Sequence, residues 1–313
     1  MISIALICDN GYVMPTVVAM VSMIENKSSN TKLSFFVLAD GLTPESISVF
    51  KSLENDTCRV NIISVDSSRY QGLEKKYSSV SRSSLLKFSI PDIIKELDKI
   101  LYIDGDVIVK KDISELYDIE LNDYYAAVVA DGPKKKIAGG KKHAYYGDPL
   151  YFNSGMMLLN LKKMREDNMA SKLINFRLNE YNYFMDQDAF NRVLGSNVIH
   201  ISLKYDMMLH LISFQNEDFT MKQLCDFYKA DNYATVDDIM DDAVVLHYTL
   251  AKPWKYYDIP GADDWMIYYK RSPYSSTTLN RKSFTTYVLN AKIYRIARSF
   301  NSVIGTLRKL IKL

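Results

Sequence analysis

The sequence has only three cysteines, Cys8, Cys58 and Cys225, and they lie far apart along its 313 residues. An odd number of isolated cysteines builds no disulfide framework, and their spacing matches no cysteine-based metal site. Such cysteine usage is typical of a protein in a reducing compartment, so we expect a cytoplasmic location.

Long apolar segments are also missing. No stretch approaches the roughly 18 uninterrupted apolar residues of a membrane-spanning helix. The first residues, MISIALICDN, lack a basic segment and reach Asp9 after a short apolar run, which predicts a buried strand and not a signal peptide. Neither G-x-G-x-x-G nor G-x-x-x-x-G-K-[ST] follows that run, which excludes the usual dinucleotide and P-loop sites.

Acidic residues are absent after Asp264, and the last 49 residues contain ten Lys and Arg. The other 29 basic residues share the first 264 positions with all 37 acidic residues, so the net charge is −8 there and +10 in the tail. Apolar residues in the tail recur every three or four positions, which predicts a basic amphipathic helix: Leu289, Ile293, Ile296, Phe300, Ile304, Leu307 and Ile311. This helix either packs on the acidic body or lies on an anionic membrane surface. We therefore expect a main domain at 1–258 and, at 259–313, a Tyr-rich linker with the basic helical tail.

Short runs rich in Ile, Val and Leu alternate with helix-like segments through the first half of the chain. The runs lack the polar alternation of a one-sided sheet, which indicates strands buried on both faces. We expect strands at 2–8, 33–39, 59–65, 99–103, 124–130 and 151–160, and another that ends at His247. Helices are expected at 15–26, 84–97, 161–182 and 186–194. Another helix is expected to begin at Pro44, with Thr43 as its N-cap. Residues 255–275 are expected to form an ordered loop or linker. This order predicts an α/β domain with a mostly parallel sheet.

The segment ILYIDGDVIV at 100–109 has two interpretations. Asp-Gly between apolar runs is typical of a type I′ hairpin turn. Alternatively, Asp104 and Asp106 point the same way and reach one hard divalent cation, while Gly105 lets another molecule approach the backbone. The continuous apolar flanks favour the second interpretation, because ligands of open α/β sheets bind at the carboxyl ends of the strands. A calcium loop of the EF-hand type is excluded, since Ile108 stands where an oxygen ligand is required.

Four further motifs accompany this segment: ICDNGY after the first strand, then FNSGMMLLN, FMDQDAFN and VVLHYTLAKPWK. In these motifs, their order and their spacing, the sequence resembles family 8 glycosyltransferases over about residues 2–258. That family includes bacterial lipopolysaccharide galactosyl- and glucosyltransferases. The resemblance implies a GT-A fold, which is Rossmann-like with a mostly parallel central sheet flanked by helices, here followed by a C-terminal basic helical extension.

In that family the acid pair binds Mn²⁺ together with a late histidine, and the corresponding residues are Asp104, Asp106 and His247. Two carboxylates and one imidazole suit Mn²⁺ or Mg²⁺. The other interpretation of His247 is a hydrogen-bonded histidine of the core. The family motif H-x-x-G-x-x-K-P-W is one residue shorter here and lacks its glycine. Lys252 still aligns with the lysine that reaches the diphosphate.

The resemblance also implies the residues that bind the donor. Ile7, Cys8, Asp9 and Tyr12 correspond to contacts with uracil and ribose, although the residues after the first strand also fit a plain turn. Lys87 stands where the family usually has arginine, so the bidentate fork is lost; it contacts phosphate or sugar, or is a solvated helix lysine. The expected nucleotide-sugar site comprises Ile7, Cys8, Asp9, Tyr12, Lys87, Asp104, Gly105, Asn153 and Lys252.

The expected catalytic residues are Gln187, Asp131 and Asp186. Asn153, Asp186 and Gln187 match the family's contacts to the donor sugar, although MDQD also fits a helix cap. Gln187 corresponds to the residue nearest the anomeric carbon, and an amide is a poor nucleophile. Front-side attack with retention is therefore the expected mechanism, and Asp131 matches a position that faces the acceptor.

The implied activity is metal-dependent transfer of galactose or glucose from a UDP-sugar to a hydroxyl of a glycan, forming an α-linkage. The acceptor is a lipopolysaccharide, capsule, lipid-linked or glycoprotein glycan, and the tail places the enzyme in the cytoplasm or on the inner face of its membrane. No nucleic-acid partner is expected. The alternative is a self-glycosylating or catalytically weak glycan-binding protein of the same fold. A second alternative is a sugar-nucleotide pyrophosphorylase, which shares the α/β topology and a metal-bound diphosphate; ICDNGYVMP argues against it, because it is not the basic Gly-rich loop that such an enzyme needs.

Overall fold

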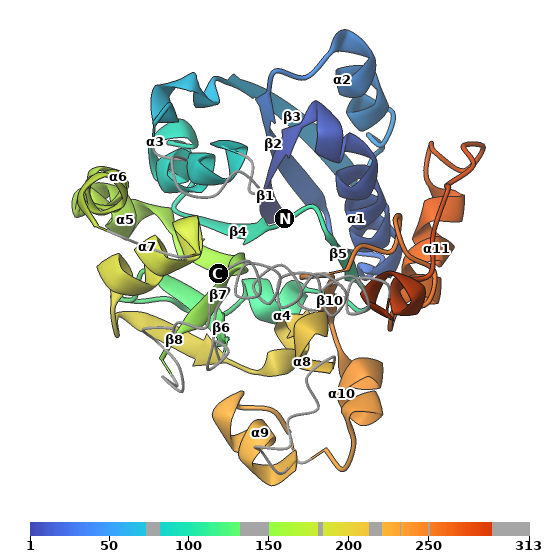
Figure 1. The fold of residues 1–313 in the computed structure, drawn as a ribbon. Helices are drawn as coiled ribbons and strands as arrows, with labels where there is room; N and C mark the ends of the chain where they lie inside the picture. Colours follow the sequence, from blue (N-terminus) through green and yellow to red (C-terminus); the bar gives the residue numbers. More distant parts are fainter. Residues whose placement is uncertain are drawn as a thin grey trace, which may run out of the picture.

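A computed structural model describes residues 1–72, 82–131, 150–180, 184–212, 221–231, 233–249 and 251–289. In this part of the chain a seven-stranded sheet has the order β3-β2-β1-β4-β7-β6-β8 (Figure 1). Its strands are β1 (Ile2–Asp9), β2 (Leu33–Asp40), β3 (Cys58–Val65), β4 (Lys99–Ile103), β6 (Ala126–Ala130), β7 (Phe152–Asn160) and β8 (Val198–Ile201). Only β7 runs antiparallel to its neighbours, so the expected mostly parallel sheet is confirmed.

A second, smaller sheet has the order β5-β10-β9, formed by β5 (Val107–Val109), β10 (Val245–His247) and β9 (Met207–Met208). β5 pairs with β10 and not with β4, so the hairpin interpretation of Asp104-Gly105-Asp106 is wrong. The chain instead passes from the large sheet into the small one at this point. The strand expected to end at His247 is confirmed.

Two apolar clusters cover the two faces of the large sheet, as alternation along a strand requires. Ile4 and Leu6 of β1 belong to the cluster that contains α1 (Val13–Asn26), whereas Ala5 between them belongs to the other. The second cluster contains residues of α5 (Leu161–Glu166), α6 (Met169–Asn179) and α7 (Met185–Leu194). Both faces are therefore covered, which explains the uninterrupted apolar runs in the sequence.

The expected helices are confirmed at α1, at α7 and at α2 (Pro44–Lys51), where the Thr43 side chain accepts from the backbone amide of Ser46. The helix expected at 84–97 is wrong: the segment is a 3₁₀ helix, η3 (Arg82–Ser89), followed by the short α3 (Ile90–Ile93). Pro91 lies in the first turn of α3. Proline is tolerated there because the backbone N–H that it lacks would have no partner within the helix at that position.

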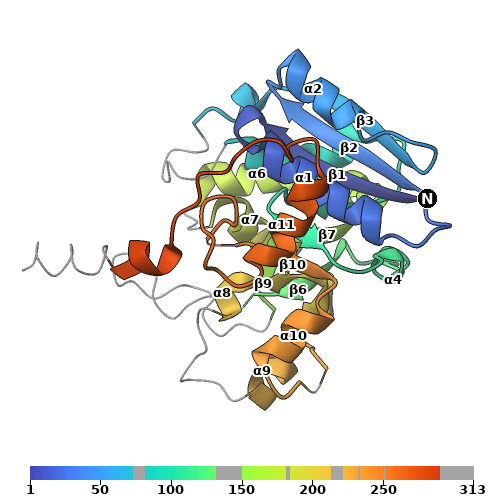
Figure 2. The same cartoon turned by 90° about the vertical axis from the view of Figure 1, so that its right-hand side faces the viewer.

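The single helix expected at 161–182 is divided into α5 and α6 by Asn168, which has a left-handed φ of 53°. The remaining described helices are η1 (Asn10–Tyr12), η2 (Ser67–Tyr70), α4 (Ser114–Tyr117), η4 (Leu203–Tyr205), α8 (Leu209–Ile212), α9 (Met221–Phe227), α10 (Val236–Asp242) and α11 (Ala262–Arg271). α9 and α10 project from the body below the sheets in both views (Figures 1 and 2).

α11 lies within the segment that we expected to be a loop or linker. It runs beside α1 in both views (Figure 2), and the Asn26 side chain donates to the Tyr268 hydroxyl at 2.8 Å. Trp265 is fully buried in the cluster that contains α1. The expected basic helical tail lies outside the described residues except at its start, where Leu289 is exposed. Within the described ranges, no helix has the length and apolarity that crossing a membrane requires.

Candidate active site

Three potential metal ligands converge where the two sheets meet. Asp104, Asp106 and His247 each offer one ligand atom, and these atoms lie within 4.8 Å of one another. Asp104 follows β4, and its backbone amide donates to the carbonyl of Gly155 at 2.7 Å. Asp106 immediately precedes β5, whose first residue, Val107, pairs with His247 in the small sheet. The acid pair and the histidine are therefore brought together by strand register.

Gly155 lies against two of these three residues, Asp104 and His247. A Cβ at this position would lie 2.4 Å from Cε1 of His247, 2.8 Å from a carboxylate oxygen of Asp104 and 2.9 Å from the Asn153 amide oxygen. Two carboxylates and an imidazole around a side-chain-free position are a donor set for Mn²⁺ or Mg²⁺. The residues present thus fit the expected metal.

Two lysines neutralise the acids of this cluster. Lys252 Nζ forms an ion pair with Asp106 and also contacts the Tyr248 carbonyl. Burial by itself would raise the pKa of Asp106, but Lys252 and His247 outweigh burial and hold that pKa below its usual range. Asp106 is therefore an anion at neutral pH, as a metal ligand must be.

Lys87 is buried and not a solvated lysine, with 4% of its side chain exposed. Its Nζ lies 2.7 Å from a carboxylate oxygen of Asp186 and 3.1 Å from one of Asp104. Burial alone would lower the pKa of Lys87, but these two carboxylates outweigh burial and raise it. Lys87 thus links the metal cluster to the residues expected to bind the sugar.

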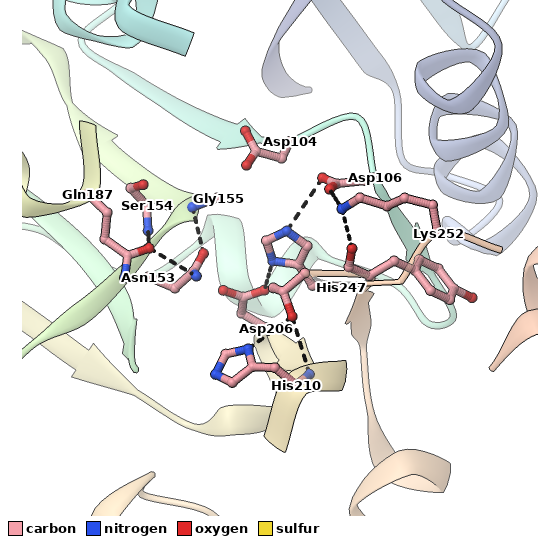
Figure 3. Close-up of polar contacts among 12 residues, drawn as sticks. Asp104, Asp106, Asn153, Ser154, Gly155, Gln187, Asp206, His210, His247 and Lys252 are labelled. Atoms are coloured by element: carbon pink, nitrogen blue, oxygen red, sulfur yellow. Dashed lines mark hydrogen bonds and ion pairs between the residues drawn. The ribbon is translucent and has the colours of Figure 1, made fainter. Parts of the chain in front are cut away.

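His247 lies between two carboxylates (Figure 3). Its Nδ1 is 2.9 Å from Oδ1 of Asp206, and its Nε2 is 3.4 Å from Oδ1 of Asp106. Burial would lower the pKa of His247, but Asp206 and Asp106 outweigh it and raise the pKa to about 10. Both interpretations of His247 are thus compatible with this position, because it is buried and hydrogen-bonded yet presents one nitrogen to the acid pair.

The expected catalytic residues form one polar network on the other side of Gly155. Gln187 donates from Nε2 to Asp131 at 2.9 Å, and its Oε1 accepts from Asn153 at 3.2 Å (Figure 3). Asp186 accepts from the Ser154 hydroxyl at 3.0 Å. No residue of MDQD is the N-cap of α7, which is Phe184, although the Asp188 carboxylate accepts from the Phe184 amide at 2.8 Å. Asp186 and Gln187 are thus left for the site.

The residues expected to bind the nucleoside follow β1. Asp9 accepts from the Gly11 amide at 2.9 Å, so the turn interpretation is correct for the backbone there. The ring of Tyr12 makes an edge-on contact with Trp254, with centroids 5.8 Å apart, which joins this turn to the KPW motif. Ile7 is half-buried, whereas the Cys8 side chain is buried in the core. Burial raises the pKa of the Cys8 thiol to about 12, so it stays protonated.

Gly105 has a packing reason for lacking a side chain. A Cβ there would lie 2.3 Å from the Thr16 hydroxyl of α1. In the structure, the lack of a side chain at Gly105 therefore lets the chain between β4 and β5 pack closely against α1.

Sequence reasoning missed Asp206 and His210. Asp206 holds His247, and His210 Nε2 lies 3.1 Å from Asp131, while His210 Nδ1 is 2.9 Å from the Thr249 hydroxyl. The only local signal for Asp206 is a single acid before two buried methionines in KYDMM. His210 is one of only four histidines, and nothing in its neighbourhood marks it as part of the site.

Known proteins share this fold. Residues across 87% of the chain superpose on 96% of galactosyltransferase LgtC, whose crystal structure contains donor and acceptor sugar analogs, with a TM-score of 0.70 and 23% identity. A crystal structure of an active-site mutant of LgtC gives a TM-score of 0.72 with 21% identity over the same share of each chain. The expected GT-A fold is confirmed.

Sequence relatives lead to the same family. The lipopolysaccharide 1,2-glucosyltransferase of Escherichia coli K12 is 27% identical over 278 residues, which are 85% of this chain and 77% of that protein. A putative glycosyltransferase of Haemophilus influenzae is 29% identical over 203 residues, 63% of this chain. The matched part of this chain spans only 61% of the length of that relative. General stress protein A from Bacillus subtilis is 30% identical over 186 residues, and the match spans 62% of its length. The model of the family described as Glycosyl transferase family 8 matches residues 3–258, and the chain therefore belongs to glycosyltransferase family 8.

Proposed function

We propose that this protein is a retaining glycosyltransferase that moves a hexose, galactose or glucose, from a UDP-sugar to a hydroxyl of a glycan acceptor and forms an α-linkage. The observation that supports this most strongly is the convergence of Asp104, Asp106 and His247 in a chain of this family. The cluster lies beside the polar network of Gln187. A diphosphate held at the metal cluster would therefore have its sugar next to that network.

Asp104, Asp106 and His247 would hold Mn²⁺ or Mg²⁺. When bound, the metal acts as a Lewis acid on the diphosphate oxygens and favours the departure of UDP. Lys252, which contacts Asp106 in the structure, would supply a point charge to the diphosphate. The uridine would lie at the end of β1, where it would contact Ile7, Asp9, Tyr12 and the backbone of Cys8.

The donor sugar would lie against Asn153, Asp186 and Lys87. Carboxylate and amide groups that hydrogen-bond sugar hydroxyls discriminate strongly against a sugar that lacks the matching hydroxyl. Asp186 is already fixed by Lys87 at 2.7 Å and by the Ser154 hydroxyl at 3.0 Å. These residues are therefore preorganised for donor recognition.

Gln187 would lie at the anomeric carbon. Its Nε2 donates to Asp131, so its Oε1 is the atom that faces Asn153 and the backbone amide of Ser154. An amide oxygen stabilises positive charge on the sugar ring but is a poor nucleophile. We therefore favour front-side attack, in which a phosphate oxygen of the departing UDP takes the acceptor proton. Asp131 faces the acceptor in this arrangement.

The acceptor is a lipopolysaccharide, capsule, lipid-linked or glycoprotein glycan, and the protein acts in the cytoplasm. The name of the Escherichia coli relative, a lipopolysaccharide glucosyltransferase, favours a lipid-borne glycan. The ten basic residues after Asp264 favour the anionic inner face of the membrane as the place of action. Co-sedimentation with anionic vesicles, compared between the full chain and a chain ending at 275, tests this; equal binding would remove the membrane role.

The proposed activity is tested by UDP release from a panel of UDP-sugars, with Mn²⁺ or EDTA and with or without oligosaccharide and lipid-linked acceptors. We expect release that requires Mn²⁺, responds to one hexose, and disappears in Asp106→Ala. Asp123→Ala, on an exposed turn and not among the site residues, is the control. Full activity in EDTA would contradict the metal assignment, and no turnover with any donor would contradict the activity.

A further inference from the structure

Asp206 is an acid that the fold buries completely, with none of its surface exposed. It lies between η4 and β9, and both hold its backbone in place. Its amide donates to the Leu203 carbonyl at 3.0 Å, and Met207 pairs with Leu246 in the small sheet. The neighbouring side chains of Leu203, Met207 and Met208 are buried. Asp206 therefore has little freedom to move.

The carboxylate of Asp206 makes its contact through one oxygen. Oδ1 accepts from Nδ1 of His247 at 2.9 Å, on the side of the ring opposite Asp106 (Figure 3). The other ring nitrogen, Nε2, then points to Asp106 and to the space beside Gly155. Because a ring nitrogen that donates to a carboxylate keeps its proton, Nε2 is the nitrogen that loses its proton and offers a lone pair when a cation binds.

The second oxygen of Asp206 finds no hydrogen-bond partner among the described residues. An unpaired buried oxygen destabilises the folded state, and so does removing a carboxylate from water. The fold could avoid this cost with a hydrophobic residue, because the adjacent positions are already apolar. A purely structural role therefore explains the packing of this segment but not the choice of aspartate.

We propose that Asp206 is a positioning residue for a divalent-cation site, which fixes His247 with its Nδ1 proton on Asp206 and its Nε2 toward the cation. Carboxylates that orient a metal-binding histidine in this way also make the imidazole a stronger ligand. The inference rests on the metal site of the proposed function. It assigns to residue 206 a role that neither the motifs nor the three-ligand cluster includes.

The test measures the affinity of the full-length protein for Mn²⁺ by the electron paramagnetic resonance signal of the free ion, without donor or acceptor. Asp206→Asn retains the shape and an oxygen that accepts from Nδ1, while Asp206→Ala removes both. We expect both variants to bind Mn²⁺ about 10- to 100-fold more weakly than the wild type, with Asn less affected than Ala. Wild-type affinity in Asp206→Asn would overturn the proposal.

Asp188→Asn is the matched control. Asp188 is also buried and accepts from the Tyr151 hydroxyl at 2.7 Å and from the Phe184 amide, but it is not part of the metal cluster. Its substitution should leave Mn²⁺ affinity unchanged. An equal loss in Asp188→Asn would mean that removing any buried carboxylate weakens the fold, and this would also overturn the proposal.

A second measurement needs no variant. In wild-type protein labelled with ¹⁵N and saturated with diamagnetic Mg²⁺, the His247 imidazole should show a protonated Nδ1 and a proton-free Nε2. A proton on Nε2 would overturn the proposal even if every Asp206 variant failed to fold. Failure of the wild type to bind either cation contradicts the metal site itself, whereas binding with the opposite tautomer contradicts only the role of Asp206.

Discussion

Gly155 contributes to the site through its backbone and through its lack of a side chain. Its backbone carbonyl accepts from Asp104, its amide donates to the Asn153 side chain at 2.7 Å, and the space where a Cβ would lie is the space between Asp104 and His247. The glycine therefore fixes two site residues through its backbone while keeping its own volume out of the metal position. Ligand distances in metal sites hold within about 0.2 Å, so displacements of this size matter.

We predict that Gly155→Ala abolishes Mn²⁺ binding and transfer but leaves a folded protein. The new Cβ would meet His247 at 2.4 Å and must displace the imidazole. Overpacking of this kind costs about 1–3 kcal/mol, less than a typical domain's stability. Mn²⁺ titration and circular dichroism of the same sample check both parts.

The matched control for Gly155→Ala is Gly195→Ala. A Cβ at Gly195 meets nothing within 4 Å, although its φ of +57° makes alanine strained there. This variant should lose stability without losing Mn²⁺ affinity. Normal Mn²⁺ binding by Gly155→Ala would show that the cation does not occupy the space beside His247.

Gln187→Ala should reduce turnover far more than it weakens UDP binding. The amide is held by Asp131 and Asn153 at the expected position of the reacting sugar, and it is not among the residues expected to contact the uridine. Removing a preorganised polar group of this kind costs about 10²- to 10³-fold in kcat. Steady-state kinetics and UDP titration separate the two effects, with Asn179→Ala at the exposed last residue of α6 as an amide control. A parallel loss of UDP affinity would place Gln187 in the nucleotide pocket.

At the scale of elements, the break between α5 and α6 explains why one periodic segment became two helices. Asn168 has a φ of 53°, and its carbonyl accepts from the Lys172 amide, so it ends one helix and begins the next. Asparagine tolerates this left-handed conformation better than other residues with a Cβ. The apolar spacing on either side does not reveal the break.

We predict that Asn168→Ala destabilises the protein by about 1 kcal/mol and that Asn168→Gly does not. The Cβ of alanine clashes with the backbone in the left-handed conformation, whereas glycine has no Cβ. Thermal unfolding of both variants measures the difference. If alanine were tolerated as well as glycine, the segment would have to re-form as one continuous helix.

At the scale of the whole molecule, the last described segment belongs to the core. Trp265 is fully buried against Trp254 and Tyr269, and Asn26 of α1 bonds to Tyr268. Lys282 also exchanges backbone hydrogen bonds with Lys255 and Tyr257, three and five residues beyond Lys252. The segment after 258 thus supports the loop that carries Lys252. The domain division at 258, drawn from sequence, stays a prediction.

A chain ending at 258 should unfold at a lower temperature than one ending at 289. The shorter chain exposes the surface that α11 covers on α1, and loss of a buried tryptophan alone costs about 3–5 kcal/mol. Thermal unfolding of both chains and of Trp265→Ala tests this. Equal unfolding temperatures would establish 1–258 as an independent unit, as the sequence suggests.

The sequence by itself determined the α/β architecture, most strands of the large sheet and the Thr43 cap. These follow from local patterns, because side-chain periodicity, proline position and turn chemistry act over a few residues. It did not reveal that η3 is a 3₁₀ helix or that α11 forms, because there tertiary packing determines the local conformation.

Only the tertiary structure decided which charged and polar side chains of the site pair with one another. Lys87 pairs with Asp186 across 99 residues, Lys252 with Asp106 across 146, and Asp206 reaches His247 across 41. Such pairs depend on strand order and register between two sheets, which no local pattern encodes. Asp206 could not be recognised from KYDMM for this reason: its function comes from the imidazole that strand β10 places beside it.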